Sequence, residues 1–230
     1  MTLQIGFLVF PQVQQLDLTG PYDVLASLSE VKVHLVWKEL APVTASTGLI
    51  LQPTTTFADC PDLDVLCVPG GSGVGPLMED PQTLAFLQAK AAKARYVTSV
   101  CTGALVLGAA GLLQGKRATT HWAYHELLSL QGAIPVQERV VRDGNLLTGG
   151  GITAGIDFAL NLAAELYGDD VAQLVQLQLE YAPAPPFASG DPRTAPASVL
   201  QQAKLKAADS LKQRTRVTER AAARLASVRN

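Results

Sequence analysis

YVTSVCTGALVLGAAG, residues 96–111, is the stretch of this sequence that decides the fold. Its first five residues, Tyr96 to Val100, are β-branched or aromatic apart from Ser99, and they predict a buried strand. The residues from Thr102 onward are small or aliphatic and predict a helix. A strand that passes directly into a helix is the basic unit of a parallel α/β sheet, and Cys101 stands at the turn between them.

Cys101 is the first candidate for chemistry. A sharp strand-to-helix turn lifts a side chain out of the sheet and directs it at the unpaired amides of the helix, which suits a nucleophile. The alternative is a small structural cysteine, because free cysteine is among the most buried residue types. Cys67, inside the apolar run Val65 to Val68, and Cys60, before Pro61, have no comparable setting.

The alternation of strand and helix extends on both sides of this stretch. Strands are predicted at residues 3–10, 31–37, 64–68, 96–100, 117–119, 137–142 and 145–148, the last two joined by the Asp143-Gly144 turn. Helices are predicted from about Thr19 to Ser29 and at residues 81–94, 102–113, 152–167, 169–179 and 198–228. We therefore expect an α/β fold with a doubly wound, mostly parallel sheet flanked by helices, flavodoxin-like, with a β-hairpin and a long C-terminal helix.

Size and composition fit one domain with a tail. The chain has 230 residues, of which 48% are hydrophobic and 17% charged. We expect residues 1–185 to form the α/β domain, and residues 186–230 to form a Pro-, Ser- and Gly-containing excursion and a basic helix that is not a separate domain. The three cysteines lack the spacing of a disulfide framework, and no apolar run is long enough to span a membrane, so we expect a cytoplasmic protein.

The C-terminal helix is strongly basic. From Val199 onward, eight Lys or Arg residues stand against two acidic ones, a net charge of +6 in a chain whose total is −2. A basic helix can bind nucleic acid, but this one shows no helix-turn-helix break and no interleaved aromatic residues. We expect it to pack on the acidic body of its own chain or on a partner chain, and we expect neither nucleic acid nor a membrane as a partner.

Three loops should meet where the parallel strands end, which is where open α/β sheets bind ligands. One follows the first strand and contains Asp17, one is the glycine-rich segment 69–75, and the third is the turn at Cys101. The glycine-rich segment is expected to bind the substrate and stabilise a negative charge beside the sulfur, although a tight turn that leads into a helix is the simpler alternative. The residues expected to do so are Gly70, Gly71, Ser72 and the amide of Thr102.

Familiar cofactor and metal motifs do not match. The glycine run at 71–75 lacks the last glycine of the dinucleotide fingerprint, and the segment from Gly111 to Arg117 is one residue too short for a P-loop. His121 and His125 are expected on one helix face, but their pattern is not that of a zinc protease and no third ligand stands out. We expect no metal and no organic cofactor.

Cys101 needs a partner to react. A helix N-terminus stabilises an anion by about 0.3 to 1 kcal/mol, or ~2 at best, while one pKa unit corresponds to about 1.4 kcal/mol. No His adjoins Cys101, and Asp17 in the loop of residues 11–17 is the best candidate. Because an ionised carboxylate would oppose thiolate formation, we expect Asp17 to hold a proton shared with Cys101, its pKa raised by burial and by the second negative centre. Alternatively, Asp17 caps the helix expected near Thr19.

Several segments of the chain are similar to one known family. The residues Cys101 to Ala104 and the segment AAGLLQGKRATTHW at 109–122 resemble the ThiJ/PfpI superfamily, within the class I glutamine-amidotransferase-like fold. DLTGP at 17–21, PGG at 69–71 and GID at 155–157 match as well, and the resemblance runs from Leu3 to about Leu179. Peptidase-like members place His directly after the nucleophile, where this chain has Thr102, and glutamine amidotransferases need a His-Glu pair that is missing after His125. Both of these activities are therefore disfavoured.

Within that superfamily, the Asp17 loop, the Cys101-Thr102 pair and the chain length most resemble members that hydrate isonitriles. The resemblance implies a homodimeric, cysteine-dependent lyase that adds water to R–N≡C through a thioimidate on Cys101 and yields an N-substituted formamide. It implies that Asp17 delivers the proton, that Thr102 places water or Asp17, and that no cofactor is needed. The alternative is a ligand- or redox-sensing protein related to the sensing domain of AraC-type transcription regulators, in which Cys101 is oxidised instead.

Overall fold

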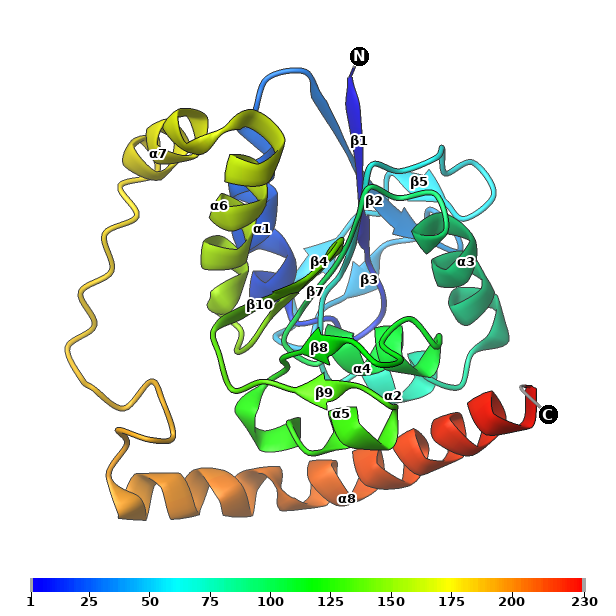
Figure 1. Ribbon diagram of the computed structural model, residues 1–230, viewed down its shortest axis with the longest axis vertical. Helices are drawn as coiled ribbons and strands as arrows, with labels where there is room; N and C mark the ends of the chain where they lie inside the picture. The colour runs from blue at the N-terminus through cyan, green and yellow to red at the C-terminus, as the bar shows by residue number, and fades with distance from the viewer. Residues whose placement is uncertain (1, 229–230) are drawn as a thin grey trace.

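A seven-stranded sheet lies at the centre of the computed structural model, which describes residues 2–228 (Figure 1). The strand order is β10-β11-β7-β6-β1-β2-β5, and every neighbouring pair is parallel except β10 with β11. The strands are β1 (Leu3–Leu8), β2 (Val31–Trp37), β5 (Thr55–Thr56), β6 (Val65–Val68), β7 (Tyr96–Val100), β10 (Val140–Asp143) and β11 (Leu146–Gly149). The predicted mostly parallel sheet with one hairpin is confirmed.

Helices cover both faces of the sheet. On one face, α1 (Gln15–Ala26) packs on α6 (Ala154–Tyr167), which contacts α7 (Asp169–Gln178); α3 (Pro81–Ala91) and α4 (Gly103–Ala109) lie on the other (Figure 1). All residues of β6 and β7 are buried, as expected for central parallel strands with both faces covered. The doubly wound arrangement predicted from the sequence is therefore present.

Short elements complete the chain. They are β3 (Val43–Thr44) paired with β4 (Ile50–Leu51), β8 (Arg117–Ala118) paired with β9 (Ile134–Pro135), α2 (Val74–Leu77), the 3-10 helix η1 (Trp122–Tyr124) and α5 (Leu127–Leu130). Among these, only β8 was predicted, because two to four residues are too few to show a hydrophobic period. His121 and His125 flank η1, so the prediction that they share an α-helical face is wrong.

The first helix begins earlier than predicted. α1 begins at Gln15 rather than near Thr19, and Pro21, expected at the helix start, lies inside the helix. The chain just before α1 is fixed by the glycine-rich segment: Val13 forms a β-bridge with Gly71, and the Gln14 amide donates to the Gly70 carbonyl at 2.8 Å. The helix starts directly after the residues held by this contact, and Asp17 lies in its first turn rather than in the expected loop.

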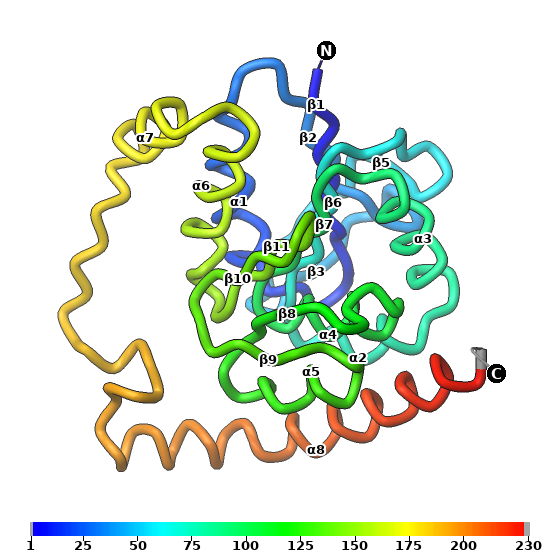
Figure 2. The backbone as a smooth tube through the Cα atoms, in the orientation of Figure 1, coloured from blue at the N-terminus to red at the C-terminus, as the bar shows by residue number. Residues whose placement is uncertain are grey.

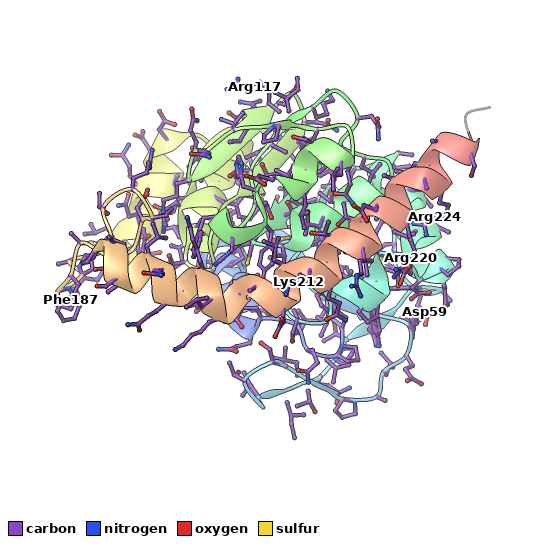
Figure 3. The ribbon with its side chains drawn as sticks, turned by 90° about the horizontal axis from the view of Figure 1, so that it is seen from below. Asp59, Arg117, Phe187, Lys212, Arg220 and Arg224 are labelled. Carbon is purple, nitrogen blue, oxygen red and sulfur yellow. The ribbon has the colours of Figure 1, made fainter. Side chains whose placement is uncertain are left out.

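The C-terminal helix α8 (Ala197–Val228) runs past the edge of the sheet at which the parallel strands end (Figure 1). Between α7 and α8 the chain swings away from the body (Figure 2). Figure 3 shows α8 lying across the molecule, with Arg220 and Arg224 on its second half. Arg220 pairs with Glu79, and Arg224 donates to the Met78 carbonyl at 2.9 Å, so the expected packing on the chain's own body is confirmed. No helix within residues 2–228 is both long and apolar enough to span a bilayer.

Candidate active site

Cys101 occupies a strained turn between β7 and α4. Its φ angle is +54°, in the left-handed region that costs an L-residue other than glycine roughly 1 to 2 kcal/mol. Two hydrogen bonds hold it there: the Cys101 amide donates to the Gly149 carbonyl at 3.0 Å, and the Thr120 hydroxyl donates to the Cys101 carbonyl at 2.7 Å. The predicted strand-to-helix turn is present, and its cysteine is only 6% exposed.

Gly103 explains why the helix can begin directly after this turn. A Cβ atom at Gly103 would lie 1.9 Å from the Val68 carbonyl oxygen, at the end of the neighbouring strand β6. Only glycine allows the start of α4 to approach β6 so closely. The α4 N-terminus, and with it the Thr102 amide, is thereby held at the end of the sheet beside Cys101.

Asp17 lies next to Cys101 and is completely buried. Its Oδ2 atom accepts a hydrogen bond from the Gly70 amide at 2.8 Å, while Oδ1 has no hydrogen-bond partner of regular geometry in the described part of the chain. Burial raises the pKa of Asp17 from 3.8 to about 7, against the lowering effect of the Gly70 amide and of the Cys101 side chain. Burial is thus the cause of the raised pKa, as predicted, whereas a raising effect of Cys101 on Asp17 is not found.

The surroundings of Cys101 favour its neutral thiol over the thiolate. Burial raises the pKa of Cys101 well above its usual value, and the neighbouring Asp17 raises it further. The Thr102 amide and the Arg214 guanidinium act in the opposite direction on this pKa but do not outweigh these effects. Asp17 therefore ionises before Cys101, and the pair then keeps one proton, on the sulfur.

The glycine-rich segment packs against Asp17 and against Thr102, the residue that follows Cys101. The Gly71 amide, at a φ of +141°, donates to the Thr102 hydroxyl at 3.2 Å. A Cβ atom at Gly70 would lie 2.6 Å from both the nitrogen and Oγ1 of Thr102 and 2.8 Å from Asp17 Oδ2, so no larger residue fits there. Two of the groups expected to stabilise a negative charge, the Gly70 and Gly71 amides, therefore donate to Asp17 and to Thr102 in this structure.

The other predicted residues lie farther out. Ser72 is exposed, and its hydroxyl donates to Gln12 Oε1 at 3.4 Å instead of contacting the Cys101 cluster. His121 Nδ1 accepts from the Ala123 amide at 3.3 Å, and His125 Nε2 lies 3.0 Å from the Val136 carbonyl oxygen. Within residues 2–228, no group of three or more His, Cys, Asp or Glu side chains is placed to hold a metal ion.

Arg214, on α8, reaches this site and was not singled out from the sequence. Its Nη2 donates to the Gly71 carbonyl at 2.8 Å, and its Cζ lies 4.3 Å from the centroid of the Tyr124 ring. The helical period offered a signal: Val217 and Ala221 are buried apolar residues three and seven positions later, which places Arg214 on the same inward face.

Comparison with known proteins gives a consistent result. The family model for the DJ-1/PfpI family matches residues 4–165. The chain is 78% identical over 225 residues to a protein named isonitrile hydratase from Pseudomonas putida, covering 98% of this chain and 99% of that protein. The crystal structure of a THiJ/PfpI family protein from Pseudomonas syringae superposes with a TM-score of 0.93 at 45% identity, covering 95% of this chain and 91% of that one. The transcriptional regulator GbdR of Pseudomonas aeruginosa is 28% identical over 187 residues, which cover 77% of this chain and 50% of the regulator.

Proposed function

This chain belongs to the DJ-1/PfpI family, and on that premise we propose that it is an isonitrile hydratase, an enzyme that adds water to R–N≡C and yields an N-substituted formamide. The observation that carries this conclusion is the 78% identity, over almost the full length of both chains, to the isonitrile hydratase of Pseudomonas putida. The buried Asp17 and Cys101 pair supplies the two groups that such a hydration needs, a nucleophile and an acid.

The first step forms a carbon–sulfur bond. Ionised Asp17 takes the proton of the Cys101 thiol, the sulfur attacks the terminal carbon of the isonitrile with the electron pair that this frees, and Asp17 passes the proton on to that carbon. The product is a neutral thioimidate, R–N=CH–S–Cys101, beside an ionised Asp17. The pair enters this step with one proton, the state that the raised pKa values of Asp17 and Cys101 favour above about pH 7.

The second step consumes water. Ionised Asp17 removes one proton from the attacking water, the hydroxyl group bonds to the thioimidate carbon, and the other water proton ends on the nitrogen. The carbon–sulfur bond then breaks, which releases R–NH–CHO and returns the one-proton pair. Thr102 supports this step through its amide, which contacts the sulfur, and through its hydroxyl, which holds the Gly71 amide.

A direct assay tests the proposal. The purified protein is incubated with a simple alkyl isonitrile, and the formamide proton is followed by NMR. We expect catalytic turnover for the wild type and none for Cys101→Ala, with Cys67→Ala as a matched control because Cys67 is a buried cysteine of the neighbouring strand. The absence of formamide from the wild-type reaction would overturn the proposed function.

A sensing role is the second candidate, because the match to the regulator GbdR covers most of this chain and about half of the regulator's length. In that case Cys101 would be oxidised by peroxide and reduced again by thiols, without hydration of isonitriles. Intact-mass analysis after peroxide treatment, run beside the formamide assay, separates the two functions.

We also propose that the protein is a homodimer and that it works in a reducing compartment. Large apolar side chains are exposed on α7 and on the arm that follows it, among them Leu177 and Phe187, and Leu205 is exposed on the first half of α8. Such side chains suit a contact with a second copy, and light scattering of the eluting protein measures the oligomer directly. All three cysteines are free, which fits a cytoplasmic location.

A further inference from the structure

Arg214 is a buried cation, and no carboxylate pairs with it within residues 2–228. Only 8% of the residue is exposed, and none of the ion pairs found among the described residues includes it. Its Nη1 atom is buried and has no hydrogen-bond partner in this part of the chain. Burying a charge without a counter-charge costs free energy. The buried Arg214 guanidinium therefore needs a negative charge close to it.

The surroundings of Arg214 hold it in one orientation. Nη2 is fixed by the Gly71 carbonyl, and the guanidinium lies over the Tyr124 ring. That ring is itself held from α8, because the Tyr124 hydroxyl donates to Ser210 Oγ at 2.9 Å. Arg214 and Ser210 are one helical turn apart, so one face of α8 fixes both η1 and the glycine-rich segment.

Four titratable groups face Arg214 or its immediate neighbours. Tyr124 and His121 come from η1 and the residue before it, Cys101 from the turn between β7 and α4, and Asp17 from α1 through its contact with Cys101. His121 and Arg214 would repel each other if both were charged, and burial together with Arg214 lowers the pKa of His121. Among these groups, only the Cys101 sulfur both bears negative charge in the proposed reaction and interacts with the guanidinium.

We propose that Arg214 is a positioning residue for the reaction: it supplies the positive charge that stabilises the Cys101 thiolate and fixes, through the Gly71 carbonyl, the loop whose amides hold Asp17 and Thr102. The C-terminal helix is then part of the active site. This inference rests on the proposed function, because it takes Cys101 to be the nucleophile.

Alkylation of Cys101 tests the proposal without any isonitrile. The rate of reaction with iodoacetamide is measured from pH 6 to 10, with the modified peptide identified by mass spectrometry. At a fixed pH below the thiol pKa, we expect Arg214→Gln and Arg214→Met to react roughly three- to tenfold more slowly than the wild type, because one pKa unit changes the thiolate fraction about tenfold. Arg214→Lys keeps the charge and should recover most of this rate.

Arg224→Gln is the matched control. Arg224 also donates from α8 to a backbone carbonyl, that of Met78, but it is not among the groups that shift the pKa of Cys101. We expect its alkylation profile to match the wild type. If Arg214→Gln does not fold, Arg214→Met carries the test, because an apolar side chain of similar length leaves no buried charge unpaired. An unchanged alkylation profile in the folded Arg214→Met protein overturns the inference.

The formamide assay is run on the same variants. Slower alkylation in Arg214→Met together with formamide production by the wild type supports both proposals. Slower alkylation without any formamide from the wild type overturns the hydratase function and leaves the link between Arg214 and Cys101 intact.

Discussion

Replacing Asp17 with asparagine should make the protein more stable while it removes the acid that hydration requires. Asp17 is fully buried, and its carboxyl group has a pKa of about 7 in the folded protein against 3.8 when unfolded. The folded state therefore binds this proton more tightly than the unfolded state does. The stability contributed by protonation is complete below pH 3.8 and is lost as the pH rises through 7.

The size of the effect follows from this difference in pKa. At pH 8, roughly three pKa units at about 1.4 kcal/mol each make the burial of ionised Asp17 cost about 4 kcal/mol of stability. At pH 5 the folded protein keeps the carboxyl group protonated while the unfolded chain ionises it, which costs about 2 kcal/mol. An asparagine side chain does not ionise, and its carbonyl oxygen can still accept from the Gly70 amide. Asp17→Asn should therefore exceed the wild type in free energy of unfolding by up to these amounts, and the two proteins should converge near pH 4.

Urea denaturation, followed by far-UV circular dichroism at pH 5, 6.5 and 8 and one protein concentration, measures this difference. Asp23→Asn, which removes an exposed carboxylate from the same helix, is the control and should show no growing advantage with pH. The reasoning is refuted if Asp17→Asn is less stable than the wild type at pH 8, or if its advantage does not increase between pH 5 and pH 8.

Three further predictions concern the same site and its surroundings. Cys101→Gly should be about 1 kcal/mol more stable than Cys101→Ala in urea, because the φ of +54° is unstrained only for glycine; equal stability would contradict a strained turn. Thr102→Val should lose about 1 to 2 kcal/mol of stability and slow formamide production, because it leaves the Gly71 amide unpaired, whereas Thr102→Ser should retain both in the same two assays. Arg220→Gln breaks an exposed ion pair with Glu79 and should leave the urea midpoint of unfolding close to that of the wild type; a clear drop in the midpoint would show that this pair anchors α8.

Local patterns in the sequence determined the sheet and the nucleophile. A strand, a turn and a helix each leave a signature within about ten neighbouring residues, so the stretch from Tyr96 to Gly111 predicted both β7 and the turn at Cys101. The same stretch did not reveal where its helix stops. α4 ends at Ala109 and not at Leu113, because Gly111 takes a φ of +79° and closes the helix early.

Tertiary structure alone decided which acidic and basic groups surround the nucleophile Cys101. Asp17 was predicted in a loop, but α1 starts directly after the residues held by the bridge between Val13 and Gly71, and the Asp17 carboxylate accepts from the Gly70 amide. Its raised pKa depends on burial, which is a property of the packed molecule and not of any local pattern. Arg214 reaches Gly71 from 143 positions along the chain. Short-range periodicity fixes which elements form, whereas proton affinity and counter-charge depend on distant segments that meet only after the sheet and its helices have packed.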